Sequence, residues 1–324
     1  MSHHSIKRIQ NDIKLYFKSD LNNNGIYIIF NDKNIYNAKA LIIGPDETPY
    51  KNGFYFFDIN YTDKYPQEPP KVLLCSLNKR TRFNPNLYTG GKVCLSILGT
   101  WSGPGWTPCL STNEVMLSIQ SLMNNNPIVN EPGYENLKPE TSSESRNYIK
   151  ILEYHNHLIA VIQMIEDIPN GFSCFRELIE SKFCENYKTN MEFLTSKLNS
   201  EDNNKVVNLN MYSLGEKLSY NHIIEKYKAL YSNLSLIYGY NTSKTNEPSD
   251  AGKNNVSNES SAHAGTKPET SSSVEVNQPK KRGPELNVTD YDVGYVTTFN
   301  NREYIVKEVN GKGGNTYKRW VLNK

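Results

Sequence analysis

Four short segments rich in β-branched and aromatic residues follow one another early in the chain. They cover residues 25–30, 38–43, 54–59 and 71–75. This composition favours β-strands. The turn-forming runs Gly44-Pro45-Asp46 and Lys51-Asn52-Gly53 lie between the second segment and the third. Four strands at this spacing predict an antiparallel meander.

Helical periodicity flanks the predicted meander. Apolar residues recur at helical spacing over residues 6–17 and again over residues 115–123. The second of these helices opens with a capping-box pattern, in which Ser111 is followed three residues later by Glu114. Together the patterns predict an α+β fold class, with a four-stranded antiparallel meander and flanking helices over residues 1–140.

A second helical region follows this core. Thr141 and Glu144 form another capping-box pattern, and one apolar helical stripe then runs from Tyr148 to Ile165. His155 lies in that stripe, and we interpret it as a satisfied core histidine rather than a ligand. Further helices are predicted around residues 175–183 and 223–231. Residues 141–240 are therefore expected to form a helical extension that packs on the core.

The rest of the chain changes composition sharply. Residues 242–283 contain no Phe, Tyr, Trp, Leu or Ile, so they cannot bury enough apolar area to offset the loss of chain entropy. We therefore expect a disordered linker over residues 241–283. Aromatic residues return at Tyr304, Tyr317 and Trp320 around a glycine-rich turn. This pattern predicts a small β-hairpin tail over residues 284–324, which needs a partner surface for stability.

Composition limits the classes of function. The net charge of the 324 residues is +2, which gives no global field that demands nucleic acid. The most apolar stretch is too short to cross a membrane, and the amino-terminus has no apolar signal core. We therefore expect no membrane partner and a cytoplasmic or nuclear location. The five cysteines include no C-x-x-C pair, so neither a disulfide framework nor a zinc site is expected.

An ordered series of motifs lies between residues 65 and 133. The motifs are Tyr65-Pro66-Gln67-Glu68-Pro69-Pro70-Lys71-Val72, Asn84-Pro85-Asn86, Cys94-Leu95-Ser96, Trp106-Thr107-Pro108 and Asn130-Glu131-Pro132. In order and spacing the series resembles the ubiquitin-conjugating enzyme family. That family has a Tyr-Pro-x-x-Pro-Pro-Lys-Val segment and a His-Pro-Asn turn. Its cysteine lies eight positions after the asparagine of that turn, as Cys94 follows Asn86.

Within the family the sequence is similar to the large Z-type enzymes. The similarity rests on Gly99-Thr100-Trp101-Ser102-Gly103-Pro104, on the segment 118–123 and on Asn130-Glu131-Pro132-Gly133, and the helical extension fits the same subgroup. The tail resembles short carboxy-terminal appendages of giant-virus proteins, which implies a viral protein acting in a host cell. The resemblance implies the UBC fold.

The resemblance also implies a reaction and its residues. Cys94 would accept ubiquitin, or a ubiquitin-like modifier, as a thioester from an activating enzyme, and would pass it to lysine amines of protein substrates. A thiolate is suited to this role because its thioester stays reactive toward amines. Asn86 matches the family asparagine credited with stabilising the oxyanion or supporting the nearby loop. Glu131 lies where the family often has an acid that orients the incoming lysine. ATP is used by the upstream enzyme, so no cofactor is expected here.

Two residues depart from the family pattern. Asn84 replaces the usual histidine, which is mainly a scaffold residue, and asparagine can also hydrogen-bond in a turn. Gln67 stands where many members place an apolar residue that contacts RING ligases, so that contact is in doubt. The residues expected to contact partner proteins, including a ubiquitin ligase, are Lys7, Arg8, Lys14, Gln67, Trp106 and Pro108. Structural or solvated roles are the alternatives for all of them, as they are for Asn86 and Glu131.

Three other functions compete with the enzyme. An inactive variant of the same fold would lack the cysteine, whereas Cys94 is present. A cysteine hydrolase would need a histidine that activates Cys94, and the sequence has none between His4 and His155. An interaction scaffold, in which the extension and tail matter more than catalysis, would keep its function in a Cys94→Ala variant.

Overall fold

The computed structural model describes residues 3–75, 78–240 and 293, together with three strands nearer the carboxy-terminus. The chain divides into two compact units, residues 1–248 and 249–324. Within the described ranges, no helix is long and apolar enough to cross a membrane. The linker predicted over residues 241–283 lies outside the described residues.

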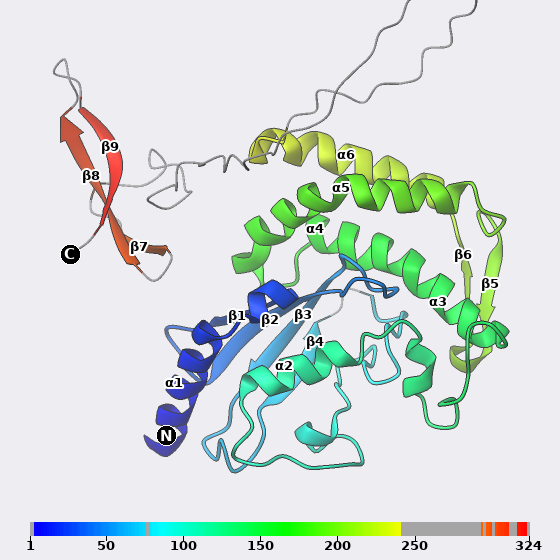
Figure 1. Ribbon diagram of the computed structural model, residues 1–324, viewed down its shortest axis with the longest axis horizontal. Coiled ribbons are helices and arrows are strands. Elements are labelled where there is room, and N and C mark those ends of the chain that lie inside the picture. The colour runs from blue at the N-terminus through cyan, green and yellow to red at the C-terminus, as the bar shows by residue number, and fades with distance from the viewer. Residues whose placement is uncertain are drawn as a thin grey trace, which may run out of the picture. The chain divides into compact units, whose positions relative to one another are not determined.

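The first unit is built on a four-stranded antiparallel sheet. Its strands are β1 (Ile26–Phe30), β2 (Asn37–Ile43), β3 (Phe54–Asn60) and β4 (Lys71–Cys75), in the order β1-β2-β3-β4. Ile26 pairs with Ile42, Ile42 pairs with Tyr55, and Phe56 pairs with Cys75. The α+β fold class and the predicted meander are therefore confirmed (Figure 1).

Strand β3 is buried on both of its faces. The four residues from Phe54 to Phe57 are all at most 2% exposed. The Phe56 ring lies 5.2 Å from the ring of Phe172, which belongs to the region after residue 140, whereas the Tyr55 ring lies 5.5 Å from Phe83. Successive strand residues point to opposite faces, so the sheet is covered on both sides. Residues on the two sides of position 140 thus share one hydrophobic core.

Two helices from the first 140 residues meet at a buried carboxylate. They are α1 (His3–Lys18) and α2 (Thr112–Ser121). Ser111 and Glu114 form the predicted capping box at the start of α2. Asp12 of α1 accepts the Thr112 backbone N–H at 3.1 Å, the Arg8 Nε–H at 2.8 Å and the Tyr65 hydroxyl. One side chain thus joins α1, the segment before β4 and the first turn of α2.

The extension contains three long helical segments. Figure 1 shows them on one side of the sheet, with α2 on the other. Helix α3 (Ser143–His155) runs on through a π-helical stretch, η4 (Asn156–Gln163), into α4 (Met164–Glu166), and α5 (Arg176–Leu198) and α6 (Tyr220–Tyr238) follow. The Tyr187 and Tyr231 rings stack at 3.7 Å, which holds α5 against α6. The short 3-10 turns are η1 (Leu21–Asn24), η2 (Ser96–Leu98), η3 (Pro127–Asn130), η5 (Ser173–Phe175) and η6 (Asn210–Tyr212).

The capping box predicted at Thr141 and Glu144 is wrong. Helix α3 begins one residue later than that pattern requires, and Ser142 caps it by accepting the Ser145 backbone N–H at 3.2 Å. The Glu144 carboxylate does not turn back to the helix start. It accepts the Met211 backbone N–H at 2.8 Å instead. The carboxylate that the local pattern predicts as part of the helix cap is therefore used in a tertiary contact.

A small hairpin in the extension escapes the sequence prediction. Strands β5 (Val206–Leu209) and β6 (Leu214–Lys217) pair antiparallel on either side of η6. Asn147 of α3 donates its Nδ2–H to the carbonyl of Asn208 at 2.9 Å, which fixes the hairpin to α3. The strands are only four residues long, too short for a clear alternating pattern.

The second unit contains a three-stranded antiparallel sheet. Its strands are β7 (Val296–Phe299), β8 (Arg302–Asn310) and β9 (Thr316–Leu322), in sequence order. Val306 of β8 pairs with Trp320 of β9. These two strands are the hairpin that the aromatic pattern indicates, and β7 is an additional strand.

Candidate active site

Cys94 lies in the long connection between β4 and η2, where two hydrogen bonds tie it to Asn86. The Cys94 backbone N–H donates to the Asn86 carbonyl at 2.8 Å, and Asn86 Nδ2 donates to the Cys94 carbonyl at 2.9 Å. The pair brings together the two residues that the spacing of eight positions singled out. Cys94 itself is 1% exposed, so its thiol lies beneath the surface of this connection.

Asn84 is the scaffold of the same turn. It is fully buried, and its Oδ1 accepts the Asn86 backbone N–H at 2.9 Å. Its Nδ2 donates to the Leu122 carbonyl at 2.7 Å and to the Tyr50 hydroxyl at 3.0 Å. Asn84, which stands where the family has histidine, therefore stabilises the turn through both the oxygen and the nitrogen of its carboxamide.

The Asn86 carboxamide is only half satisfied. Its Nδ2 supports the Cys94 carbonyl, whereas its Oδ1 is buried and accepts no hydrogen bond from the described residues. An amide nitrogen carries two N–H donors, so one donation to Cys94 leaves the other for a further acceptor. Loop support is thus visible in the geometry, and stabilisation of an oxyanion stays a prediction.

Thr100 closes the loop that follows Cys94. Its hydroxyl donates to the Val93 carbonyl at 2.7 Å and accepts the Leu95 backbone N–H at 2.9 Å. Beyond it the segment 101–105 is exposed, and Trp101 is 40% exposed. The backbone on either side of the cysteine is therefore fixed, while the next part of the loop faces solvent.

Glu131 is held by two residues that the sequence did not single out. Its Oε2 accepts the Tyr212 hydroxyl at 3.0 Å and lies 3.8 Å from Nη2 of Arg82. The Arg82 guanidinium lies over the Tyr88 ring at 3.8 Å and near the Tyr212 ring at 4.9 Å. Burial raises the pKa of Tyr212, so its hydroxyl is a neutral donor. Arg82 stands close to the Asn84 turn in sequence, but nothing local marks Tyr212.

The residues expected to contact partners form part of one surface. Lys7, Lys14 and Gln67 are exposed, and with Pro108 they line a groove of about 570 Å³. Arg8 has an internal role: its guanidinium donates to the carbonyls of Pro108 and Leu110 as well as to Asp12. Of the six residues expected to contact partners, four therefore line the groove with side chains that make no hydrogen bond or ion pair to other described residues. These four are Lys7, Lys14, Gln67 and Pro108.

Trp106 is half-buried at the edge of the same surface. Its indole N–H donates to the Pro66 carbonyl at 2.6 Å, and its ring lies 5.8 Å from that of Tyr65. These contacts fix the loop that carries Pro108 against the segment that carries Gln67. Trp106 therefore fixes the position of two residues that line the groove, Gln67 and Pro108.

Two of the three histidines of the extension, His155 and His157, are buried and occupied elsewhere. His155 lies 3.1 Å from the Thr81 hydroxyl and 3.2 Å from Glu216, and His157 Nδ1 lies 2.7 Å from the Tyr227 hydroxyl. His155 is thus the satisfied core residue that was predicted. In the described part of the chain, no contact brings a histidine to Cys94, which the hydrolase alternative requires.

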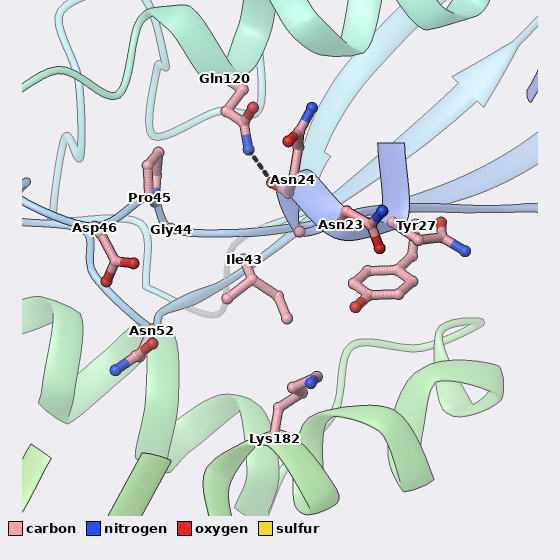
Figure 2. A pocket seen from close by; sticks show the side chains of 12 residues that line it. Asn23, Asn24, Tyr27, Ile43, Gly44, Pro45, Asp46, Asn52, Gln120 and Lys182 are labelled. Atoms are coloured by element: carbon pink, nitrogen blue, oxygen red, sulfur yellow. Dashed lines mark hydrogen bonds between the residues drawn. The ribbon is translucent and has the colours of Figure 1, made fainter. Parts of the chain in front are cut away.

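A pocket of about 700 Å³ lies away from these residues. It is lined by the segment 22–25, by the turn 44–46 and by Lys182 of α5, and Figure 2 shows Gln120 donating across it to the Asn24 carbonyl. Neither Cys94, Asn86 nor Glu131 lines it. The site residues predicted from the sequence therefore lie outside this pocket. Across the described residues, no cluster of three or more His, Cys, Asp or Glu is placed to hold a metal ion.

Comparison with known proteins gives the family. The sequence model of the ubiquitin-conjugating enzyme family matches residues 8–156, a segment that contains the whole sheet, Cys94, Asn86 and Glu131. Over this segment the chain matches the ubiquitin-conjugating enzyme family. The ubiquitin-conjugating domain shares the hydrophobic core of the first unit with the helical extension.

Similar proteins extend the comparison into the extension. Ubiquitin-conjugating enzyme E2 Z of Xenopus tropicalis is 40% identical over 187 residues, which are 57% of this chain and 58% of the relative. The human E2 Z is 40% identical over 181 residues, or 56% of this chain and 50% of the relative. Human BIRC6, named a dual E2 ubiquitin-conjugating enzyme and E3 ubiquitin-protein ligase, is 42% identical over 153 residues, or 45% of this chain and 3% of the relative. The chain thus spans between half and three-fifths of the two E2 Z relatives.

Proposed function

We propose that this chain accepts ubiquitin, or a ubiquitin-like modifier, as a thioester on Cys94 and transfers it to lysine amines of protein substrates. The match of residues 8–156 to the ubiquitin-conjugating enzyme family supports the proposal. The observation that carries it is the pair of hydrogen bonds that join Cys94 to Asn86, at 2.8 and 2.9 Å. These bonds join the backbone of the cysteine to a buried amide in a fixed turn, and the proposal puts the carbonyl bound to sulfur beside that amide.

The first step is loading. The Cys94 thiolate attacks the thioester carbonyl that joins the modifier to the cysteine of an activating enzyme, and the activating enzyme's thiolate leaves. One carbon–sulfur bond forms as another breaks, so the energy of the thioester is conserved. ATP is consumed upstream, and this chain needs no cofactor for the exchange. Because Cys94 is 1% exposed, the connection around it must open for the thiol to reach its donor.

The second step is transfer to an amine. A substrate lysine attacks the Cys94 thioester carbonyl, charge builds on the carbonyl oxygen, the Cys94 thiolate leaves, and the amine loses a proton. The first N–H of Asn86 Nδ2 is bonded to the backbone carbonyl of Cys94. The second N–H is therefore the donor available to the oxygen of the thioester carbonyl. Glu131, which is partly exposed, supplies a carboxylate for the incoming amine.

Partner proteins are proposed to bind the groove beside α1. Its exposed residues Lys7, Lys14, Gln67 and Pro108 offer two cations and two neutral side chains, a surface suited to an acidic partner. The activating enzyme and a ubiquitin ligase are the partners that the proposed reaction requires. A cytoplasmic or nuclear location and a viral origin stay predictions from the sequence.

The test is a charging assay with the whole chain. Incubation with an activating enzyme, ATP and ubiquitin should give a reductant-sensitive adduct on the parent and on Cys109→Ala, a control at an exposed cysteine. Cys94→Ser should give a more stable oxyester, because a hydroxyl oxygen is a poorer leaving group than a thiol sulfur. Reductant-sensitive charging of Cys94→Ala would refute the assignment. Repeating the assay with several modifiers would identify the one that is used.

A further inference from the structure

The hairpin of the extension is fixed so that η6 faces the ubiquitin-conjugating domain. Asn147 donates to the Asn208 carbonyl at 2.9 Å, and Glu144 accepts the Met211 backbone N–H at 2.8 Å. Both contacts come from α3, and both fall on residues that precede Tyr212, the last residue of η6. The hairpin is therefore attached to α3 just before the residue that it presents.

Tyr212 makes three contacts with groups near the candidate active site. Its hydroxyl donates to Glu131 Oε2 at 3.0 Å, and its ring lies 4.9 Å from the Arg82 guanidinium and 5.7 Å from the Tyr148 ring. Arg82 also approaches Oε2 of Glu131, at 3.8 Å. Glu131 Oε1 accepts no hydrogen bond from the described residues, and the side chain is 25% exposed. One oxygen is thus held, and the other is open to a donor from outside.

A short series of contacts joins this carboxylate to the cysteine. The Arg82 Nη2 that faces Glu131 donates to the Pro85 carbonyl at 2.5 Å, and Pro85 is the middle residue of the turn that holds Cys94. The next residue in that turn, Asn86, donates to the Cys94 carbonyl. Tyr148 holds the backbone of Arg82, because its hydroxyl donates to the Arg82 backbone carbonyl at 2.8 Å.

We propose that Tyr212 is a positioning residue for the attack of lysine, acting through Glu131. This inference rests on the proposed function. By holding Oε2, the Tyr212 hydroxyl turns Oε1 of Glu131 outward, where it accepts an N–H of the incoming amine and orients its lone pair toward the thioester. The extension then contributes to aminolysis and not to loading, because loading involves no amine.

The experiment compares loading and discharge for Tyr212→Phe, Glu131→Gln and their combination. The matched control is Tyr238→Phe, which also removes a tyrosine hydroxyl of the extension that donates to a glutamate, Glu180 Oε2 at 2.8 Å. Each variant is preloaded, the activating enzyme is stopped, and discharge is followed with free lysine and with hydroxylamine. Hydroxylamine is a stronger nucleophile than lysine near pH 7, so its attack depends less on being oriented by a carboxylate.

Tyr212→Phe should load at the parent rate and discharge to lysine about tenfold more slowly, which corresponds to about 1.4 kcal/mol of barrier. Discharge to hydroxylamine should change less than twofold, by about 0.4 kcal/mol at most. The double variant should be no slower than Glu131→Gln, because both changes remove one function. Tyr238→Phe should match the parent with both nucleophiles.

Three results would overturn the positioning role. Tyr212→Phe could discharge to lysine at the parent rate, slow both nucleophiles equally, or slow the Glu131→Gln variant further. The first would show that the hydroxyl has no role, and the other two that it acts on the general stability of the site. In each case the parent would still load at Cys94, so the proposed function would stand. Failure of the parent to load would instead refute the proposed function and this inference with it.

Discussion

Replacing Asn86 by alanine should separate the two half-reactions. The substitution removes the Nδ2 donor and leaves the Cys94 carbonyl without its 2.9 Å partner, but it also removes an Oδ1 that is buried without one. The lost hydrogen bond costs about 1 kcal/mol, and the newly unpaired carbonyl costs up to about 2 kcal/mol more. Removing the unpaired oxygen offsets part of this, so we expect a net loss of about 1–2 kcal/mol. A domain of ordinary stability remains folded after such a loss.

The kinetic effect should be larger, and it should fall on one step. Loading exchanges one thiolate for another at an activated carbonyl, whereas aminolysis asks a neutral amine to attack and builds more charge on the carbonyl oxygen. Loss of one donor aimed at that oxygen slows a reaction by roughly 100-fold or more, or about 3 kcal/mol. Single-turnover discharge of preloaded Asn86→Ala to free lysine measures this directly. Asn86→Asp should also be slow, because a carboxylate would repel the oxyanion.

Asn84→Ala is the matched control for Asn86→Ala. It removes the support of the same turn, since Asn84 accepts the Asn86 backbone N–H at 2.9 Å, but it keeps the Asn86 carboxamide. We expect it to lower thermal stability and to slow loading and discharge to similar extents. If Asn86→Ala behaves in the same way as Asn84→Ala, Asn86 is only a turn residue. Discharge of Asn86→Ala at the parent rate would refute the oxyanion role altogether.

Two further predictions concern the extension. Deleting residues 141–324 should expose Phe56, whose ring packs on that of Phe172 at 5.2 Å. This deletion should lower the free energy of unfolding by at least about 3 kcal/mol, measured by thermal or urea unfolding. Deleting only residues 241–324 should leave charging of Cys94 intact. Equal stability of both fragments would contradict this. Burial lowers the pKa of His157 to about 3, so below about pH 6.5 the unfolded chain takes up a proton that the folded chain does not. Unfolding free energy should therefore fall by about 2 kcal/mol between about pH 6.5 and pH 5. His157→Asn should flatten this slope, and the exposed control His222→Asn should not.

The sequence identified the cysteine and its asparagine but not the environment of Glu131. Cys94 and Asn86 lie eight positions apart, so their pairing is set within one connection and can be recognised as a motif. Glu131 and Tyr212 are 81 residues apart, and their hydrogen bond depends on where the hairpin docks on α3. No local pattern encodes that docking, because Tyr212 belongs to a three-residue 3-10 turn without periodicity.

The sequence by itself determined the elements whose signals are local. Alternation, helical spacing and the Ser111 capping box specify the meander and the main helices, because backbone conformation and amphipathic burial act over a few residues. Tertiary structure decided which polar groups meet. It directed Glu144 to Met211 instead of a helix cap, and it placed the Arg8 guanidinium on the Pro108 carbonyl, 100 residues away. Such partners follow from how packed elements approach one another, since a buried charge or donor bonds to whatever group the fold brings within reach.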